Sequence, residues 1–186
     1  MNKALRYMFW GYFFIFFRLH VMIDLFMDPI GYYLIFAGCS RLVDAFPRAK
    51  KAMIVGLIGM LISVPSVFVN LSDTALPIGW SIYGTLLSVL KLVIAYYLFN
   101  VLIDAAKMIG NQALQNRTKT TYKFYISINL FTLALLSFSM NVADDGWIAL
   151  SLISMIGVLI MDVLFLLLIG AVRRVSPKDH RINYSI

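Results

Sequence analysis

Long runs of apolar residues, separated by short polar segments, organise the chain from one end to the other. The runs are continuously apolar rather than alternating, which indicates α-helices rather than half-buried strands. Their bounds are about 7–27, 29–46, 52–69, 78–103, 122–142 and 147–172. Crossing a bilayer takes about 20 helical residues, so the second and third runs are near the lower limit. We predict an all-α fold, a polytopic membrane bundle of six transmembrane helices.

Composition supports lipid as the solvent of this chain. Of its 186 residues 61% are hydrophobic and only 13% are charged, against about 25% charged in typical soluble domains. No stretch has the composition of a separate soluble domain, so we expect one integral membrane domain over residues 1–186. The lipid bilayer is the expected partner, and another membrane protein is a second candidate.

The distribution of charge predicts the orientation. With the N-terminus inside, the inner segments hold Lys3, Arg6, Arg41, Arg48, Lys50, Lys51, Lys107, Arg117, Lys119, Lys123, Arg173, Arg174, Lys178 and Arg181. The outer loops hold Asp24, Asp28, Asp73, Asp144 and Asp145 without any Lys or Arg. Basic residues favour the cytoplasmic side, so we expect a plasma-membrane protein with both termini cytoplasmic. Because these residues sit in short loops beside apolar runs, we expect no nucleic-acid partner.

Some boundaries are less regular. Asp28 alone is left as the turn between the first two runs, with Pro29 at the first helical position and Asp28 as its cap. A tight or re-entrant hairpin is one alternative there, and a first segment lying along the interface is another. Pro65 should kink the third helix. The polar stretch 104–123 should continue the fourth helix and then form a basic loop.

Aromatic residues should mark the two interfaces, where rings that are part apolar and part polar are favoured. Trp80 and Trp147 are expected at the outer one, and Trp10, Tyr122 and Tyr125 at the inner one.

A polar cluster is expected inside the apolar layer, where charges need partners. Counted at about 1.5 Å per residue, Lys91, Asp162 and Asn129 lie at a similar depth. We predict a Lys91–Asp162 ion pair with Asn129 as a hydrogen-bonding neighbour. Polar stripes should face the bundle interior, and they comprise Ser81, Thr85, Ser88 and Lys91 in one run and Ser151, Ser154 and Asp162 in another. Arg18, also inside the layer, has no evident partner.

His20, Asp24 and Asp28 recur every four residues and form an acidic face toward the outer end. Such side chains could relay a proton or bind a metal, or else cap helix ends and line a wet vestibule. One helix cannot surround a metal alone, so we predict no metal site. Small residues, namely Gly31, Gly38, Gly56, Gly59 and Ser63, should permit close helix packing.

The segment from Asp24 to Tyr32, Asp-Leu-Phe-Met-Asp-Pro-Ile-Gly-Tyr, resembles the signature Asp-Ile-Leu-Pro-Asp-Phe-Ile-Gly-Tyr of an uncharacterised family of small multi-pass proteins of Gram-positive bacteria. The matching positions are Asp24, Asp28, Ile30, Gly31 and Tyr32, whereas the proline is displaced from the position of Met27 to Pro29. The following stretch 34–42 and its basic loop are also similar. The resemblance covers about the first quarter of the chain and implies a bacterial plasma membrane.

Functional motifs are scarce in the sequence. It has no Gly-rich phosphate loop, no Gly-x-Ser-x-Gly elbow and no His-Glu-x-x-His pair, and we identify no catalytic residue and no cofactor. A non-enzymatic accessory, sensor or immunity-type protein is favoured. The alternative is a small-solute or proton-coupled transporter or its substrate-binding subunit, and a lipid-modifying enzyme using Asp24, Asp28 or His20 is a third. A cavity reaching Lys91 and Asp162 would favour transport, and a dry centre would favour the accessory role.

Overall fold

The protein is all-α in a computed structural model that describes residues 1–21, 27–68, 77–138 and 145–176. These residues form six α-helices and one 3-10 turn. The helices are α1 (Asn2–Val21), α2 (Met27–Ser40), α3 (Pro47–Ile62), α4 (Ile78–Ile109), α5 (Gln112–Phe138) and α6 (Asp145–Val175), and the turn is η1 (Val64–Val67).

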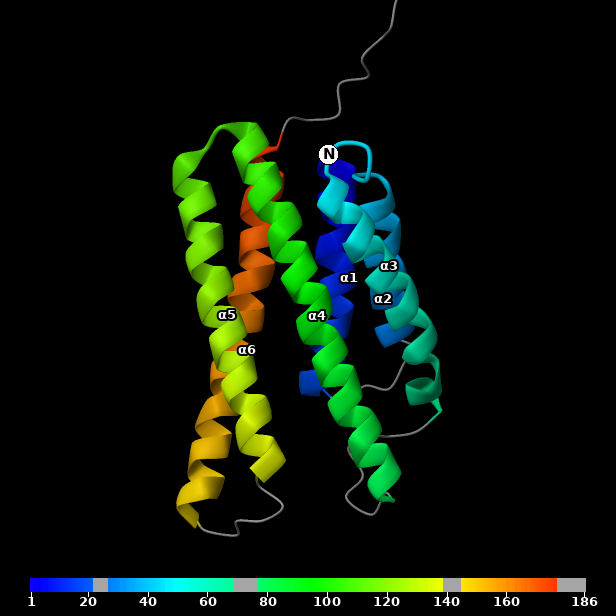
Figure 1. The fold of residues 1–186 in the computed structure, drawn as a ribbon, viewed down its shortest axis with the longest axis vertical. Helices are drawn as coiled ribbons and strands as arrows, with labels where there is room; N and C mark the ends of the chain where they lie inside the picture. Colours follow the sequence, from blue (N-terminus) through cyan, green and yellow to red (C-terminus); the bar gives the residue numbers. More distant parts are fainter. Residues whose placement is uncertain (22–26, 69–76, 139–144, 177–186) are drawn as a thin grey trace, which may run out of the picture.

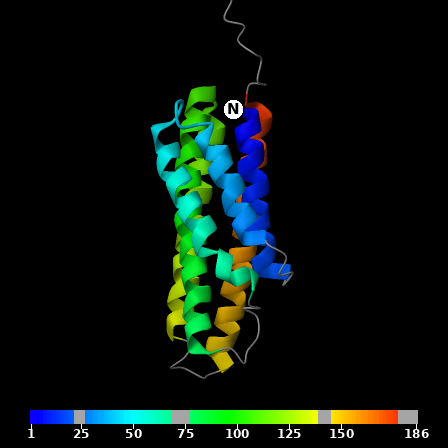
Figure 2. The same cartoon turned by 90° about the vertical axis from the view of Figure 1, so that its right-hand side faces the viewer.

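The helices lie side by side and run alternately up and down (Figure 1). Each packs against the next along the chain from α1 to α6, and α6 returns to pack against α1. The bundle is therefore closed by a contact between its first and last helices. Figure 2 shows the same elongated arrangement from the side.

One end of the bundle gathers the basic residues, and we call it the basic end. It holds the start of α1, the α2–α3 and α4–α5 connections and the finish of α6 (Figure 1). Its residues are Lys3, Arg6, Arg41, Arg48, Lys50, Lys51, Lys107, Arg117, Lys119, Lys123, Arg173 and Arg174. Arg48 of α3 pairs there with Asp104 of α4 at 3.1 Å. We call the opposite end, where α4 and α6 begin, the distal end.

The predicted turn between the first two helices is wrong. α1 ends at Val21 and α2 begins at Met27, so Asp28 is neither the turn nor the cap but lies in the first turn of α2. An acidic side chain and a proline both suit that turn, because its N–H groups are free and the helix dipole is positive there. α2 also ends at Ser40, six residues before the predicted bound, and α3 already begins at Pro47.

Pro65 ends a helix instead of kinking it. α3 stops at Ile62, and Pro65 lies in the short 3-10 turn η1. Proline lacks an N–H and disfavours helical backbone in the residue before it. The predicted third helix, 52–69, is thus displaced toward the N-terminus.

The predicted basic loop within 104–123 is also wrong. α4 continues to Ile109, and α5 begins at Gln112, ten residues before the predicted start. Gly110 takes the left-handed backbone with φ 74° that commonly ends a helix. The side chain of Asn111 then accepts the N–H of Leu114 at 2.9 Å and caps α5. Two residues therefore make the whole connection.

Close helix contacts occur where glycines were expected to allow them. A Cβ added to Gly31 would lie 2.7 Å from the carbonyl oxygen of Gly11, and one added to Gly38 would lie 2.9 Å from that of Ala4. Gly56 and Gly59 of α3 likewise face α2, at Phe36 and Tyr32. These contacts hold α1, α2 and α3 together as one side of the bundle.

The outer surface of the bundle is rich in large apolar side chains. Examples more than half exposed are Ile78 and Ile82 on α4, Phe124 and Leu130 on α5 and Leu152, Ile153 and Leu167 on α6. By length and composition, α4 and residues Gly146–Val175 of α6 are able to cross a membrane.

Candidate functional site

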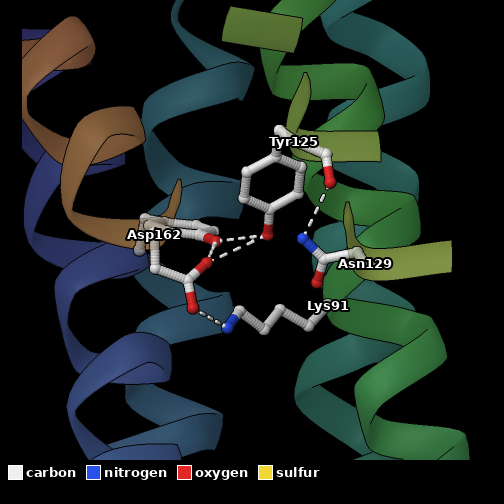
Figure 3. Close-up of polar contacts among 5 residues, drawn as sticks. Lys91, Tyr125, Asn129 and Asp162 are labelled. Carbon is white, nitrogen blue, oxygen red and sulfur yellow. Dashed lines mark hydrogen bonds and ion pairs between the residues drawn. The ribbon is translucent and has the colours of Figure 1, made fainter. Parts of the chain in front are cut away.

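The centre of the bundle holds the ion pair predicted from the depth of its two residues. Lys91 of α4 directs its Nζ at Oδ2 of Asp162 on α6, and the two groups are in direct contact (Figure 3). Both residues are buried, Lys91 with 4% and Asp162 with 0% of its surface exposed. Figure 3 shows the lysine chain extending from α4 across the bundle to the carboxylate.

Two tyrosines complete the shell of the carboxylate. The hydroxyl of Tyr12 on α1 donates to Asp162 Oδ1 at 2.6 Å, and that of Tyr125 on α5 donates to the same oxygen at 3.1 Å. The two hydroxyl oxygens are themselves 2.7 Å apart. Asp162 therefore ties together α1, α4, α5 and α6, and we call Tyr12, Lys91, Tyr125 and Asp162 the central cluster.

Burial makes each of these bonds necessary. A charge removed from water carries a desolvation penalty of several kcal/mol, offset only if a counter-charge and further hydrogen bonds replace the water. Lys91 supplies the counter-charge, and the tyrosine hydroxyls satisfy the second carboxylate oxygen. The arrangement holds a net-neutral pair inside an apolar protein, with both carboxylate oxygens hydrogen-bonded.

Aromatic rings cover the central cluster on the side facing the basic end. The ring centroid of Phe165 lies 4.6 Å from that of Tyr12 and 4.2 Å from that of Phe99. Phe99 also contacts Tyr125, with centroids 5.4 Å apart, and all four rings are fully buried. Phe99 lies eight residues beyond Lys91 on α4, about 12 Å nearer the basic end. We call Phe99 and Phe165 the aromatic layer.

On the other side the lysine faces a cavity of about 150 Å³. It lies between α4, α5 and α6 and is lined by Ser88, Lys91, Asn129, Thr132, Leu133, Leu136, Met155 and Val158. Leu136 and Met155 are 46% and 53% exposed, so the cavity opens at the surface of the bundle. A cavity of about 150 Å³ can hold a molecule the size of benzene. We call it the Lys91 cavity.

The polar wall of this cavity presents mainly acceptor oxygens. Ser88 donates its hydroxyl proton to the Gly84 carbonyl at 3.1 Å, and Thr132 donates to that of Ile128 at 2.9 Å. Asn129 Nδ2 donates to the Tyr125 carbonyl at 2.9 Å (Figure 3). Lys91, whose ammonium has N–H groups besides the one directed at Asp162, and the second N–H of Asn129 are the donors that can serve a ligand. The wall suits a small molecule that carries both a hydrogen-bond donor and an acceptor.

Asn129 is near the pair, but its predicted hydrogen bond to it is absent from the part of the chain described. One N–H of its amide instead donates to the Tyr125 carbonyl one turn back in its own helix, a common choice for short polar side chains. Asn129 and Lys91 both line the Lys91 cavity.

Of the other residues expected at the site, some lie where predicted and others do not. Thr85 is exposed, so the predicted inward stripe on α4 is wrong at that position, whereas Ser88 lines the cavity and Ser154 is buried. Arg18 and His20 fall within α1, but their side chains, like the whole of Asp24, lie outside the described residues. Asp28 is 6% exposed in α2. The expected acidic face of His20, Asp24 and Asp28 therefore stays a prediction.

Sequence reasoning missed both tyrosines. Tyr125 was expected at the inner interface, yet its surface is 0% exposed and its hydroxyl bonds Asp162. Its spacing of one helical turn from Asn129 was the available signal, because both then share a face of α5. Tyr12 carries no comparable signal, since it lies in a run of aromatic residues.

Fold and site together define an all-α bundle with a charged pair at its centre and a small cavity beside it. The chain matches no protein-family model, no curated protein and no solved structure.

Proposed function

We propose that the protein is a multi-pass protein of the plasma membrane that takes up a small polar solute or protons at the central cluster. In this proposal six helices cross the bilayer, with the basic end in the cytoplasm. The Lys91 cavity is the observation that carries the functional part. It reaches one member of the buried pair, Lys91, and brings that charge within reach of the outside of the bundle, whereas Asp162 lies behind the lysine and does not line it.

Two features support the membrane location. The exposed apolar side chains on α4, α5 and α6 form a surface that water would solvate poorly, and α4 and α6 meet the length and composition of a span. The segregation of basic residues to one end agrees with the rule that cytoplasmic segments are enriched in Lys and Arg.

The asymmetry of the site supports uptake from the distal side. The aromatic layer and the buried apolar residues beyond it, among them Leu102 and Ile169, fill the half of the bundle toward the basic end. The cavity lies in the other half, toward the distal end. Passage across the membrane would require the rings of Phe99 and Phe165 to separate, so they are the proposed inner barrier of the pathway.

A second candidate is a non-enzymatic accessory protein that acts through a partner. Both carboxylate oxygens of Asp162 are hydrogen-bonded within the central cluster, and the half of the bundle beyond it is packed. Both features suit an ion pair whose only task is to fix the order of four helices. The Lys91 cavity would then be a packing defect through which no solute or proton passes.

Access to the cavity separates the two candidates. Cys39 is the only cysteine, so a Cys39→Ser chain provides a cysteine-free background for single replacements. Ser88→Cys should react with a membrane-impermeant thiol reagent added to the outside of intact cells. Ala95→Cys on the same helix, fully buried beyond the cluster, is the matched control and should stay unreactive.

Transport itself is measured with purified protein in liposomes that contain a pH-sensitive dye. Proton entry down an imposed gradient should exceed that of empty liposomes. It should be lost in the Asp162→Asn/Lys91→Met double variant, which removes both members of the buried pair and leaves no unpaired charge inside the bundle. An unreactive Ser88→Cys together with no proton flux would leave the accessory role as the better account.

A further inference from the structure

A second hollow lies on the outer face of α1 and α2, close to the basic end. It has a volume of about 310 Å³ and is lined by Arg6, Tyr7, Trp10, Phe14 and Leu34. This volume is at the lower end of the range of ligand pockets, about 300–1,000 Å³. Among the described residues its lining is aromatic and apolar apart from Arg6, which carries a positive charge, so it differs chemically from the central cluster.

The order of the residues along α1 gives the hollow a direction. Arg6, Trp10 and Phe14 follow at four-residue spacing and therefore lie on one face of the helix. The cation is nearest the basic end, and the two rings follow over the next two turns, about 12 Å in all. A ligand that fits would be anionic at one end and apolar along the rest.

A second cation contacts one of the residues that line the hollow. The guanidinium carbon of Arg41 lies 4.3 Å from the centroid of the Tyr7 ring, a cation–π contact that holds Arg41 at the rim of the hollow. Among the described residues neither Arg6 nor Arg41 forms an ion pair with an acid. Trp10 is 47% exposed and lines the hollow.

We propose that this hollow binds an anionic phospholipid of the cytoplasmic leaflet, an inference that rests on the proposed membrane location but not on transport. The phosphate lies between Arg6 and Arg41, where the planar guanidinium groups can donate paired hydrogen bonds. The upper part of one acyl chain lies along Trp10, Phe14 and Leu34, which removes apolar surface from the surrounding lipid interface. The cytoplasmic leaflet carries the anionic lipids that such basic residues attract.

Trp10 provides a local probe of this site. In a chain carrying Trp80→Phe and Trp147→Phe it is the only remaining tryptophan, since the sequence has three. The protein is reconstituted into phosphatidylcholine vesicles that contain a small fraction of phosphatidylglycerol with brominated acyl chains, which quench nearby indole fluorescence. Brominated phosphatidylcholine at the same fraction is the comparison lipid.

Phosphatidylglycerol should quench Trp10 at a lower mole fraction than phosphatidylcholine. Arg6→Gln should reduce this preference about fivefold, the factor expected for one basic residue at a membrane surface. Arg117→Gln, an exposed basic residue of α5 at the same end, is the matched control and should leave the preference unchanged.

Equal quenching by the two lipids, or an equal loss in both variants, would overturn the site and indicate ordinary surrounding lipid. Loss of the preference on adding inorganic phosphate would also overturn it, because a free anion would then suffice. Flotation of the vesicles is measured on the same samples. Failure of the protein to float with them would overturn the membrane location itself.

Discussion

The carboxylate of Asp162 is the residue on which the interior depends most. It receives the ammonium of Lys91 and both tyrosine hydroxyls, and none of its surface reaches solvent. Replacing it changes the electrostatic state of four helices at once. The ion pair is therefore the place where a single substitution should have the largest effect.

Asp162→Asn should destabilise the protein by about 3–5 kcal/mol, because it leaves the buried ammonium of Lys91 without a counter-charge. Adding Lys91→Met should recover most of the lost stability, because it removes the unpaired ammonium. The free energy of unfolding, measured by denaturant titration in mixed micelles, tests both variants. A double variant no more stable than Asp162→Asn would mean that the pair does not govern stability.

Tyr12→Phe should cost about 1.5–3 kcal/mol, the range for a hydrogen bond to a charged group. The ring and its contact with Phe165 are retained, so only the hydroxyl is tested. Tyr33→Phe, with 53% of the residue exposed, is the control and should be close to neutral in the same titration. Equal small effects would show that Tyr125 alone satisfies the second carboxylate oxygen.

At the residue scale, the sequence predicted the Lys91–Asp162 pair but not the two tyrosines that bind the carboxylate. Depth along the helix is readable from residue number, and it brought Lys91 and Asp162 to one level. Which tyrosine turns inward depends on the rotation of each helix about its axis. That rotation is set by packing between α1, α5 and α6, which no local pattern encodes for Tyr12.

At the scale of the helices, apolar runs predicted how many there are better than where they end. Hydropathy records which residues suit an apolar environment, whereas a helix ends where its backbone hydrogen bonds end. α4 and α5 thus extend through polar residues up to the pair Gly110 and Asn111, a stop and a cap. Pro65 ended α3 for the same kind of local reason.

Gly31→Ala should separate α1 from α2, because the added methyl group would lie 2.7 Å from the Gly11 carbonyl oxygen. Overpacking of this kind costs about 1–3 kcal/mol, so the melting temperature in detergent should fall. Gly84→Ala on α4 is the control, since nothing lies within 4 Å of its added methyl group. That variant should be neutral or slightly stabilised through its better helix propensity. A similar fall in both would show that the α1–α2 contact is not limiting.

The helices also differ in length across the bundle. At about 1.5 Å per residue, α4 and α6 exceed 45 Å, whereas α2 with its 14 residues measures about 21 Å. A bilayer core is about 30 Å thick, so the proposed membrane would have to thin, or the α1–α2 hairpin would have to enter without crossing fully. In the six-span proposal the bilayer is therefore thinned around α2, whereas a re-entrant first hairpin would avoid that deformation.

For the whole molecule, both proposals depend on which end of the bundle faces the cytoplasm. The basic residues define one end, the aromatic layer lies toward that end, and the Lys91 cavity lies on its far side. The proposed lipid site is also near the basic end. If the orientation were reversed, the cavity would face the cytoplasm and the lipid hollow would face the leaflet poorer in anionic lipids.

Orientation is tested with single cysteines in the Cys39→Ser background. Gly79→Cys marks the distal end at the start of α4, where nothing crowds the position, and Lys50→Cys marks the basic end in α3. An impermeant thiol reagent should label the first in intact cells and the second only after permeabilisation, because basic segments are retained on the cytoplasmic side. The opposite pattern would show that the basic end faces outward. Labelling of both positions only after permeabilisation would show that the bundle does not span the plasma membrane. In either case Ser88 could no longer be reached from outside the cell by way of the distal half of the bundle.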